Sequence, residues 1–156
     1  MEATRNVIFP LLLVLSACLA GPAMSQTDAN DLAGAEQNGK YAEAFQQVET
    51  QARQGVPQAQ YSLGRMYAFG QGVERDMVTA VTWYRKAAEQ GLAEAQYHLG
   101  EAYGAGEGVP QDYVRAYQWM QRAAQNGEKK AKAAMQSYAN LMTEAQLEQA
   151  RQGHAE

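Results

Sequence analysis

A repeat of 36 residues is the sequence feature that most limits how this chain can fold. When the sequence is shifted by 36 positions, residues 55–90 align with residues 91–126 without a gap, and sixteen of the 36 pairs are identical. The identical pairs include the two tryptophans, Trp83 and Trp119, and four pairs of glycines. Repetition at such a period is typical of solenoids, in which each unit buries its apolar surface against its neighbours.

Each copy predicts two helices joined by a glycine turn. In the first helix, Ala59, Leu63 and Tyr67 recur at helical spacing and form one apolar stripe. The second helix begins after Asp76, a residue type that caps a helix by accepting hydrogen bonds from its free N–H groups. Trp83 lies on the apolar side of this second helix, and we expect it in the core. Glycine follows both helices, because it readily adopts the positive φ of a helix C-terminus.

Two glycines fall inside a helix instead of at its end. Gly64 and Gly100 occupy the same position in the first helix of each copy, where glycine costs about 0.5–1 kcal/mol relative to alanine. We therefore expect another helix to approach closely at these two residues.

The repeats also divide the chain. Partial copies flank the full ones, and Thr143 followed by Gln146 matches a capping box that opens a last helix. This helix is expected to cover the exposed end of the stack. The predicted segments are a signal peptide (1–25), a flexible N-terminal segment (26–39), a repeat region (40–139) and a capping helix (143–152). Within the repeat region the full copies are 55–90 and 91–126, and the partial copies are 40–54 and 127–139.

The composition agrees with an all-α chain. Alanine occurs 29 times and glutamine 19 times, while the single isoleucine, Ile8, lies in the first ten residues. Such a chain has too few β-branched residues for a sheet and many residues that favour helix. The formal net charge of −4 argues against nucleic-acid binding, which normally requires a basic surface.

The first 25 residues have the layout of a secretory signal peptide. Arg5 precedes an apolar run over residues 7–17, and small residues follow. The sequence offers two alternative processing sites. Cleavage after Ser25 would release a protein that begins at Gln26, whereas the run Leu15-Ser16-Ala17-Cys18 resembles a bacterial lipobox in which Cys18 is acylated. We expect an exported protein, either periplasmic or lipid-anchored in the cell envelope.

The repeated motif resembles a known family. It reads Ala59-x-x-x-Leu63-Gly64-x-x-Tyr67-x-x-Gly70-x-Gly72-Val73-x-x-Asp76-x-x-x-Ala80-x-x-Trp83-x-x-x-Ala87-Ala88-x-x-Gly91, and it returns from Ala95 to Gly127. Over about residues 40–136 it is similar to the Sel-one-like repeat, a relative of the tetratricopeptide repeat. The resemblance implies a right-handed α/α superhelix that acts as an adaptor or scaffold, with exported bacterial members working in the envelope. Many members carry more repeats, and cysteine-rich members join each hairpin by a disulfide that this chain lacks.

No pattern of catalytic or metal-binding residues stands out. The two histidines are His98, which corresponds to Ser62 in the other copy and is expected to be a solvent-facing polar residue, and His154, near the C-terminus. Metal sites usually need three or four converging ligands, and no such cluster is visible in the sequence. We therefore predict a protein that is not an enzyme and has no cofactor or metal.

A binding surface is expected on the first helices, which line the concave side of such solenoids. The candidate partner-binding residues are Tyr61, Arg65, Tyr97 and Glu101, because exposed tyrosine and arginine often anchor interfaces. Alternatively, both tyrosines pack between repeats. The sequence favours a monomeric adaptor or regulator that binds a peptide or protein, without nucleic acid, and at a membrane only if Cys18 is acylated. A lipid-anchored scaffold of an envelope complex and a binder of glycan or peptidoglycan are the alternatives.

Overall fold

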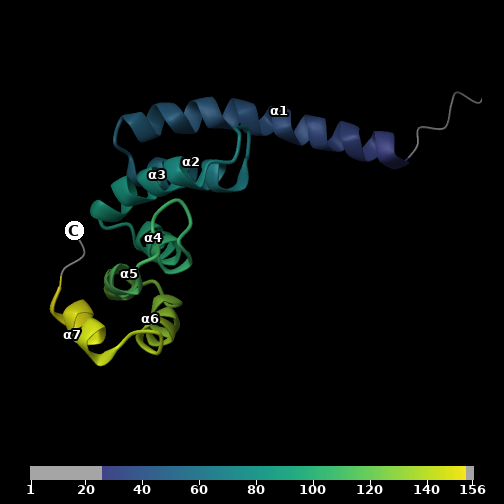
Figure 1. Ribbon diagram of the computed structural model, residues 1–156. Helices are drawn as coiled ribbons and strands as arrows, with labels where there is room; N and C mark the ends of the chain where they lie inside the picture. The colour runs from purple at the N-terminus through teal and green to yellow at the C-terminus, as the bar shows by residue number, and fades with distance from the viewer. Residues whose placement is uncertain (1–25, 154–156) are drawn as a thin grey trace, which may run out of the picture.

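The computed structural model describes the backbone of residues 26–153 and the side chains of residues 39–153. Within residues 26–153 the chain forms helices and no strand (Figure 1). These helices are α1 (Gln26–Arg53), α2 (Pro57–Phe69), α3 (Met77–Glu89), α4 (Ala93–Ala105), α5 (Tyr113–Gln125), α6 (Ala131–Ala139) and α7 (Glu144–Gln152). None of these helices has the length and apolar character that a membrane span needs. The predicted signal peptide with Cys18, and also His154, lie outside the described residues.

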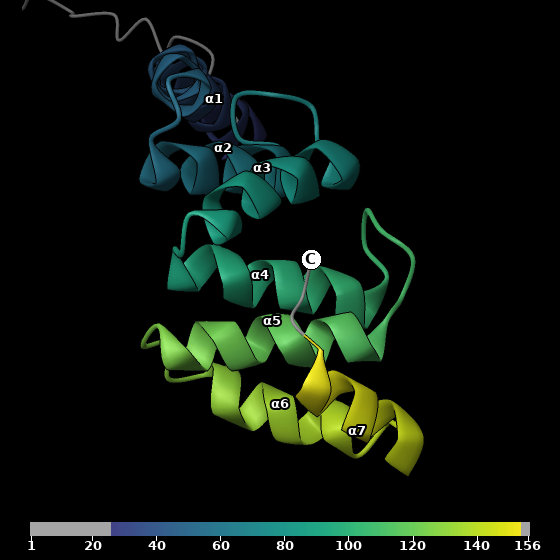
Figure 2. The same ribbon diagram turned by 90° about the vertical axis from the view of Figure 1, so that its left-hand side faces the viewer.

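The helices form a stack of hairpins, as the repeat predicts. The pairs α2–α3 and α4–α5 are the two full copies, and each helix from α1 to α5 packs against the next one along the chain. Figure 2 shows α4, α5 and α6 lying one below another, with α2 and α3 above them and α1 at the top. The predicted all-α solenoid is confirmed.

The ends of the helices follow the expected chemistry. Gly70 and Gly106 have φ values of 67° and 73°, in the left-handed region that favours glycine, and they end α2 and α4. Asp76 accepts hydrogen bonds at Oδ1 from the N–H groups of Val78 (2.9 Å) and Thr79 (3.1 Å). Asp112 caps α5 by accepting a hydrogen bond from the N–H group of Arg115 (3.0 Å). The glycine turns and aspartate caps therefore set the lengths of the repeated helices.

The two glycines inside helices are explained by close helix packing. A Cβ on Gly64 would lie 2.7 Å from ring carbons of Tyr84 in α3, and a Cβ on Gly100 would lie 3.1 Å from Cε of Met120 in α5. In both hairpins the second helix lies so near the first that a side chain in place of the glycine would push against Tyr84 or Met120 of the second helix. The predicted close approach is confirmed, and the cost of glycine is balanced by packing.

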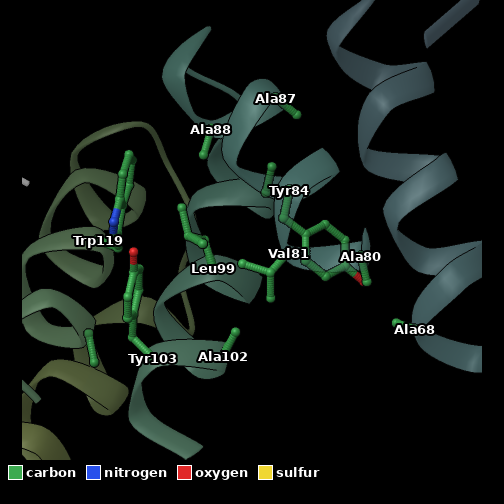
Figure 3. Packing of buried hydrophobic residues seen from close by; sticks show 12 residues of the cluster. Ala68, Ala80, Val81, Tyr84, Ala87, Ala88, Leu99, Ala102, Tyr103 and Trp119 are labelled. Atoms are coloured by element: carbon green, nitrogen blue, oxygen red, sulfur yellow. The ribbon is translucent and has the colours of Figure 1, made fainter. Parts of the chain in front are cut away.

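The core is continuous from one unit to the next. One cluster of buried side chains includes residues of α3, α4 and α5 (Figure 3), among them Val81, Leu99 and Trp119, each no more than 2% exposed. Much of the alanine lies here as well, and Ala80 and Ala116 are fully buried at the helix contacts. Because these residues come from different hairpins, a hairpin on its own would leave them exposed.

A buried glutamine links each unit to the preceding helix. Gln96 is 3% exposed, and its Nε2 donates to the carbonyl oxygen of Ala88 at the end of α3 (3.0 Å). Its Oε1 accepts from Nδ2 of Asn126 at the end of α5 (2.9 Å). The same two contacts occur one unit earlier, between Gln60, the Ala52 carbonyl and the Gln90 amide. Each glutamine thus joins the ends of two second helices that belong to successive units.

The N-terminal segment differs from the prediction. Residues 26–39, expected to be a flexible segment, form the first half of α1, which extends past α2 and α3 (Figure 1). The expectation was wrong about secondary structure because it relied on the missing apolar periodicity. Periodicity reports which residues are buried, whereas a helix can form without an apolar stripe.

The last helix begins and ends close to the predicted residues. Thr143 and Gln146 form the expected capping box, and α7 begins directly after it. It packs against α5, and its Ala150 is buried. A capping box fixes where a helix begins but not which helix it packs against.

The two tryptophans provide a test of how much contact with neighbouring units contributes to stability. Trp119 is 1% exposed, whereas Trp83 is only partly buried, contrary to the expectation that both lie in the core. Both have a cation over the ring, Lys86 or Arg122. We predict that Trp119→Ala lowers the free energy of unfolding by about 3–5 kcal/mol and that Trp83→Ala lowers it clearly less. Urea denaturation measures the free energy of unfolding of both variants. An equal decrease in the two variants would contradict the difference in burial between Trp119 and Trp83.

The buried glutamine provides a second test. Gln96→Ala removes two hydrogen bonds, one to the Ala88 carbonyl, which keeps the one from the Gly91 N–H, and one from the Asn126 amide. Because each is worth about 0.5–1.5 kcal/mol, we predict a loss of about 1–3 kcal/mol in the free energy of unfolding. The control is Gln125→Ala on exposed helix surface, where the change should stay within about 0.5 kcal/mol. If both variants unfold at the same urea concentration as the unchanged protein, the glutamine link does not contribute to stability.

Candidate functional site

The first helices of the two full copies bring the predicted binding residues onto one surface. Tyr61 and Arg65 lie on α2, and Tyr97 and Glu101 lie on α4. Arg65 is exposed, and the other three are partly buried. We call this region the α2–α4 surface; it comprises Tyr61, Arg65, Phe69, Tyr97, His98 and Glu101.

His98 is at the centre of this surface. Its ring lies 5.6 Å from the ring of Tyr61 and 5.6 Å from that of Tyr84, stacked on both, and it meets Tyr97 edge-on at 5.5 Å. Its Nδ1 is 2.9 Å from Oε2 of Glu101. The imidazole therefore connects two units, because Tyr61 and Tyr84 belong to the first copy and the other residues to the second.

The prediction for His98 was therefore wrong. The sequence marked it as a solvent-facing residue because the other copy has Ser62 at that position, yet its side chain is 33% exposed and surrounded by aromatic rings. One signal was available, since His98 and Glu101 stand three residues apart and must share a helix face. The contact with Tyr61 was not predictable from spacing along the chain.

Tyr61 agrees with the alternative in which the tyrosines pack between repeats. Tyr61 packs between the repeats, against Tyr84 at 5.9 Å and His98, while part of its ring stays exposed on the α2–α4 surface. The guanidinium carbon of Arg65 lies 5.9 Å from the ring centres of Tyr61 and Phe69. Phe69 is 63% exposed and was not among the predicted binding residues. Arginine and aromatic side chains are enriched in protein interfaces.

Burial and hydrogen bonding determine which of these groups are charged. Burial raises the pKa of Tyr97 to about 12, and its hydrogen bond to Glu101 contributes to the shift. Burial also raises the pKa of Tyr61, although Arg65 opposes it. For Glu101, burial raises the pKa, but hydrogen bonds from His98 and Tyr97 outweigh it and hold the value below the usual range. At neutral pH the surface therefore presents neutral tyrosines around one carboxylate.

A cavity of about 530 Å³ lies beside this cluster, between the C-terminal halves of α2 and α4. Its floor includes the buried side chains of Tyr84 and Ala102, and Phe69 forms part of its wall. Arg75 and Glu107 line it together with His98 and Glu101. An apolar floor with charges of both signs around it suits an apolar side chain flanked by polar groups.

The part of the chain that the structure describes contains no group of three or more His, Cys, Asp or Glu side chains placed to hold a metal ion. The chemistry that the α2–α4 surface offers is aromatic contact, hydrogen bonding and charge pairing. These are the interactions by which proteins recognise peptides and other proteins.

Comparison with known proteins agrees with the repeat seen in the sequence. Residues 57–92 and 93–128 each match the family model of the Sel1 repeat. A protective antigen present in uropathogenic Escherichia coli strains, displaying an SLR fold, is 38% identical with a TM-score of 0.69, and the match covers 70% of this chain and 24% of the antigen. A Sel1 repeat protein from Oxalobacter formigenes is 43% identical with a TM-score of 0.59, and the match covers 61% of this chain and 71% of that protein.

A curated protein also shares the repeat. The chitin synthase regulator SKT5 of Saccharomyces cerevisiae is 48% identical over 46 residues, which are 30% of this chain and 7% of the regulator. This chain thus spans a small part of the yeast regulator and about a quarter of the E. coli antigen. With two matched repeats, a shared solenoid fold and 43% identity over most of the O. formigenes protein, the chain belongs to the Sel1 repeat family.

Proposed function

We propose that this chain is a non-catalytic adaptor or regulator of the bacterial cell envelope, and that it binds a peptide or protein segment on the α2–α4 surface. Sel1 repeat proteins are generally protein-interaction modules. The observation that carries the proposal is the cluster around His98, which places aromatic rings, one carboxylate and an exposed arginine beside a cavity. Aromatic and arginine side chains supply most of the binding energy in many interfaces.

The form of the surface favours an extended segment over a small ligand. The cavity has the volume of a few side chains, and Phe69 and Arg65 continue the surface beyond it along α2. Arg65 and Glu101 occupy the same repeat position with opposite charges. A partner segment that pairs with both would carry an acidic and a basic side chain, one for each unit.

The envelope is proposed from the first 25 residues, because a positive residue, an apolar run and small residues are the layout of an export signal. The match to a yeast regulator is in keeping with a regulatory role, although it covers one repeat and part of another. If Cys18 is acylated, the chain would instead hold an envelope complex at the membrane as a scaffold.

The proposed partner surface is tested by charge reversal. We predict that Arg65→Glu weakens binding of a partner purified with the protein from the native envelope by about tenfold or more, because the guanidinium would be lost between two exposed rings. Lys129→Glu, at an exposed lysine before α6, is the matched control and should leave the affinity unchanged. Titration calorimetry gives both values. Binding that is the same for the two variants would reject the α2–α4 surface as the site.

The proposed export is tested by mass spectrometry of the protein isolated from its own cells. We expect a species that begins at Gln26 without lipid, because apolar and helix-breaking residues continue past Cys18. A mass corresponding to an acylated N-terminal Cys18 would show the lipid-anchored form. An intact chain that still begins at Met1 would contradict export altogether.

A further inference from the structure

A second hollow region lies at the C-terminal end of the stack, away from the α2–α4 surface. Two adjoining cavities of about 510 and 250 Å³ share Lys132 and Met135 and follow the line between α5 and α6, with α7 along one edge. We call this region the terminal groove. Its main lining residues are Tyr117, Ala124, Lys132, Met135, Ala139 and Arg151.

The same repeat positions are buried inside the stack. Thirty-six residues before Tyr117, Ala124, Met135 and Ala139 stand Val81, Ala88, Leu99 and Tyr103. These four are all 3% exposed or less, whereas all four residues of the groove are partly exposed.

A helix covers these positions in the interior. Val81, Ala88, Leu99 and Tyr103 share one buried cluster with Ala116 and Trp119 of α5, the thirteen-residue second helix of the next hairpin. At the end of the stack, α7 covers one edge, where it buries Ala150 and contributes Leu147 and Arg151 to the groove. The face is therefore shaped to receive a helix.

The groove is not built for one more helix of the repeat type. Gly64 and Gly100, which allow the second helix to come close, are replaced at the equivalent position of α6 by Gln136. A helix bound here has to lie further from α6 than α5 lies from α4. It needs larger apolar side chains to reach Met135, which argues against α1 or α3 of a second copy as the occupant.

The charge of the groove favours one kind of partner. Lys132 and Arg151 are exposed, and none of the residues lining either cavity is acidic. The α2–α4 surface, in contrast, carries Glu101 beside Arg65. A helix with carboxylates along its polar face would match the two cations of the groove.

We infer that the terminal groove binds an amphipathic helix of a partner protein, with large apolar residues on one face and acidic residues on the other. The bound helix lies against α5 and α6 as α5 lies against α3 and α4 inside the stack. Its carboxylates form ion pairs with Lys132 and Arg151. This is a helix-in-groove interaction and is separate from the binding proposed for the α2–α4 surface.

The test uses the whole chain and two fluorescent thirteen-residue helical peptides. Both carry leucine and phenylalanine on one face; the polar face bears glutamate in one peptide and lysine in the other. We expect the acidic peptide to bind about tenfold or more tightly than the basic one, and less tightly at high salt. Met135→Glu should weaken the acidic peptide by about tenfold, whereas Ala133→Glu, on an exposed part of α6, should not.

Three results would overturn the inference. The first is equal binding of the two peptides, and the second is binding of the acidic peptide that does not change in Met135→Glu. The third is self-association of the free chain that Met135→Glu abolishes, because a second copy would then be the occupant of the groove. Circular dichroism confirms that each variant is folded. Arg65→Glu should leave peptide binding unchanged, so failure here is distinguishable from failure of the α2–α4 surface.

Discussion

The structure depends on contact between successive units, because no hairpin can bury its own apolar faces. One core cluster draws residues from both full copies, and its buried members Val81 of α3 and Leu99 of α4 belong to successive units. The buried Gln96 adds a polar connection between the same units, since it hydrogen-bonds to the ends of α3 and α5. Contact of both kinds repeats every 36 residues and determines how one hairpin sits on the next.

This dependence explains the differences between equivalent residues. Trp119 is buried and Trp83 is half-buried, although both have the same place in the repeat. Likewise, Leu99 is buried while Met135 is partly exposed. The repeat determines where a side chain points, and the number of units around it determines how far it is covered.

Much of the fold was predictable because it is encoded locally. Asp76 caps α3, Gly70 ends α2, and Thr143 with Gln146 opens α7, each through hydrogen bonds within a few residues of sequence. Less could be predicted at the site. The position of His98 depends on Tyr61 and Tyr84, which reach it only when two units stack. The neighbour of α7 was likewise not encoded in its capping box.

Identical and different residues of the two copies have separate roles in this account. Identical residues such as Gly64 and Gly100 serve the packing of helices, whereas Arg65 and Glu101 differ and lie on the surface proposed to bind a partner. The groove at the end of the stack also depends on how many units surround a repeat position. Where no further unit covers α5 and α6, positions that are buried in the interior become a groove.

Native-state hydrogen exchange of the free protein tests the central claim most directly, because it measures the stability of each helix separately. If contact between units holds the fold, amides of α3, α4 and α5 exchange slowest and through one common unfolding event, whereas α6 and α7 open at lower free energy. Two results would contradict it: α2–α3 and α4–α5 exchanging as independent units with different free energies, or protection in α6 and α7 equal to that in α4.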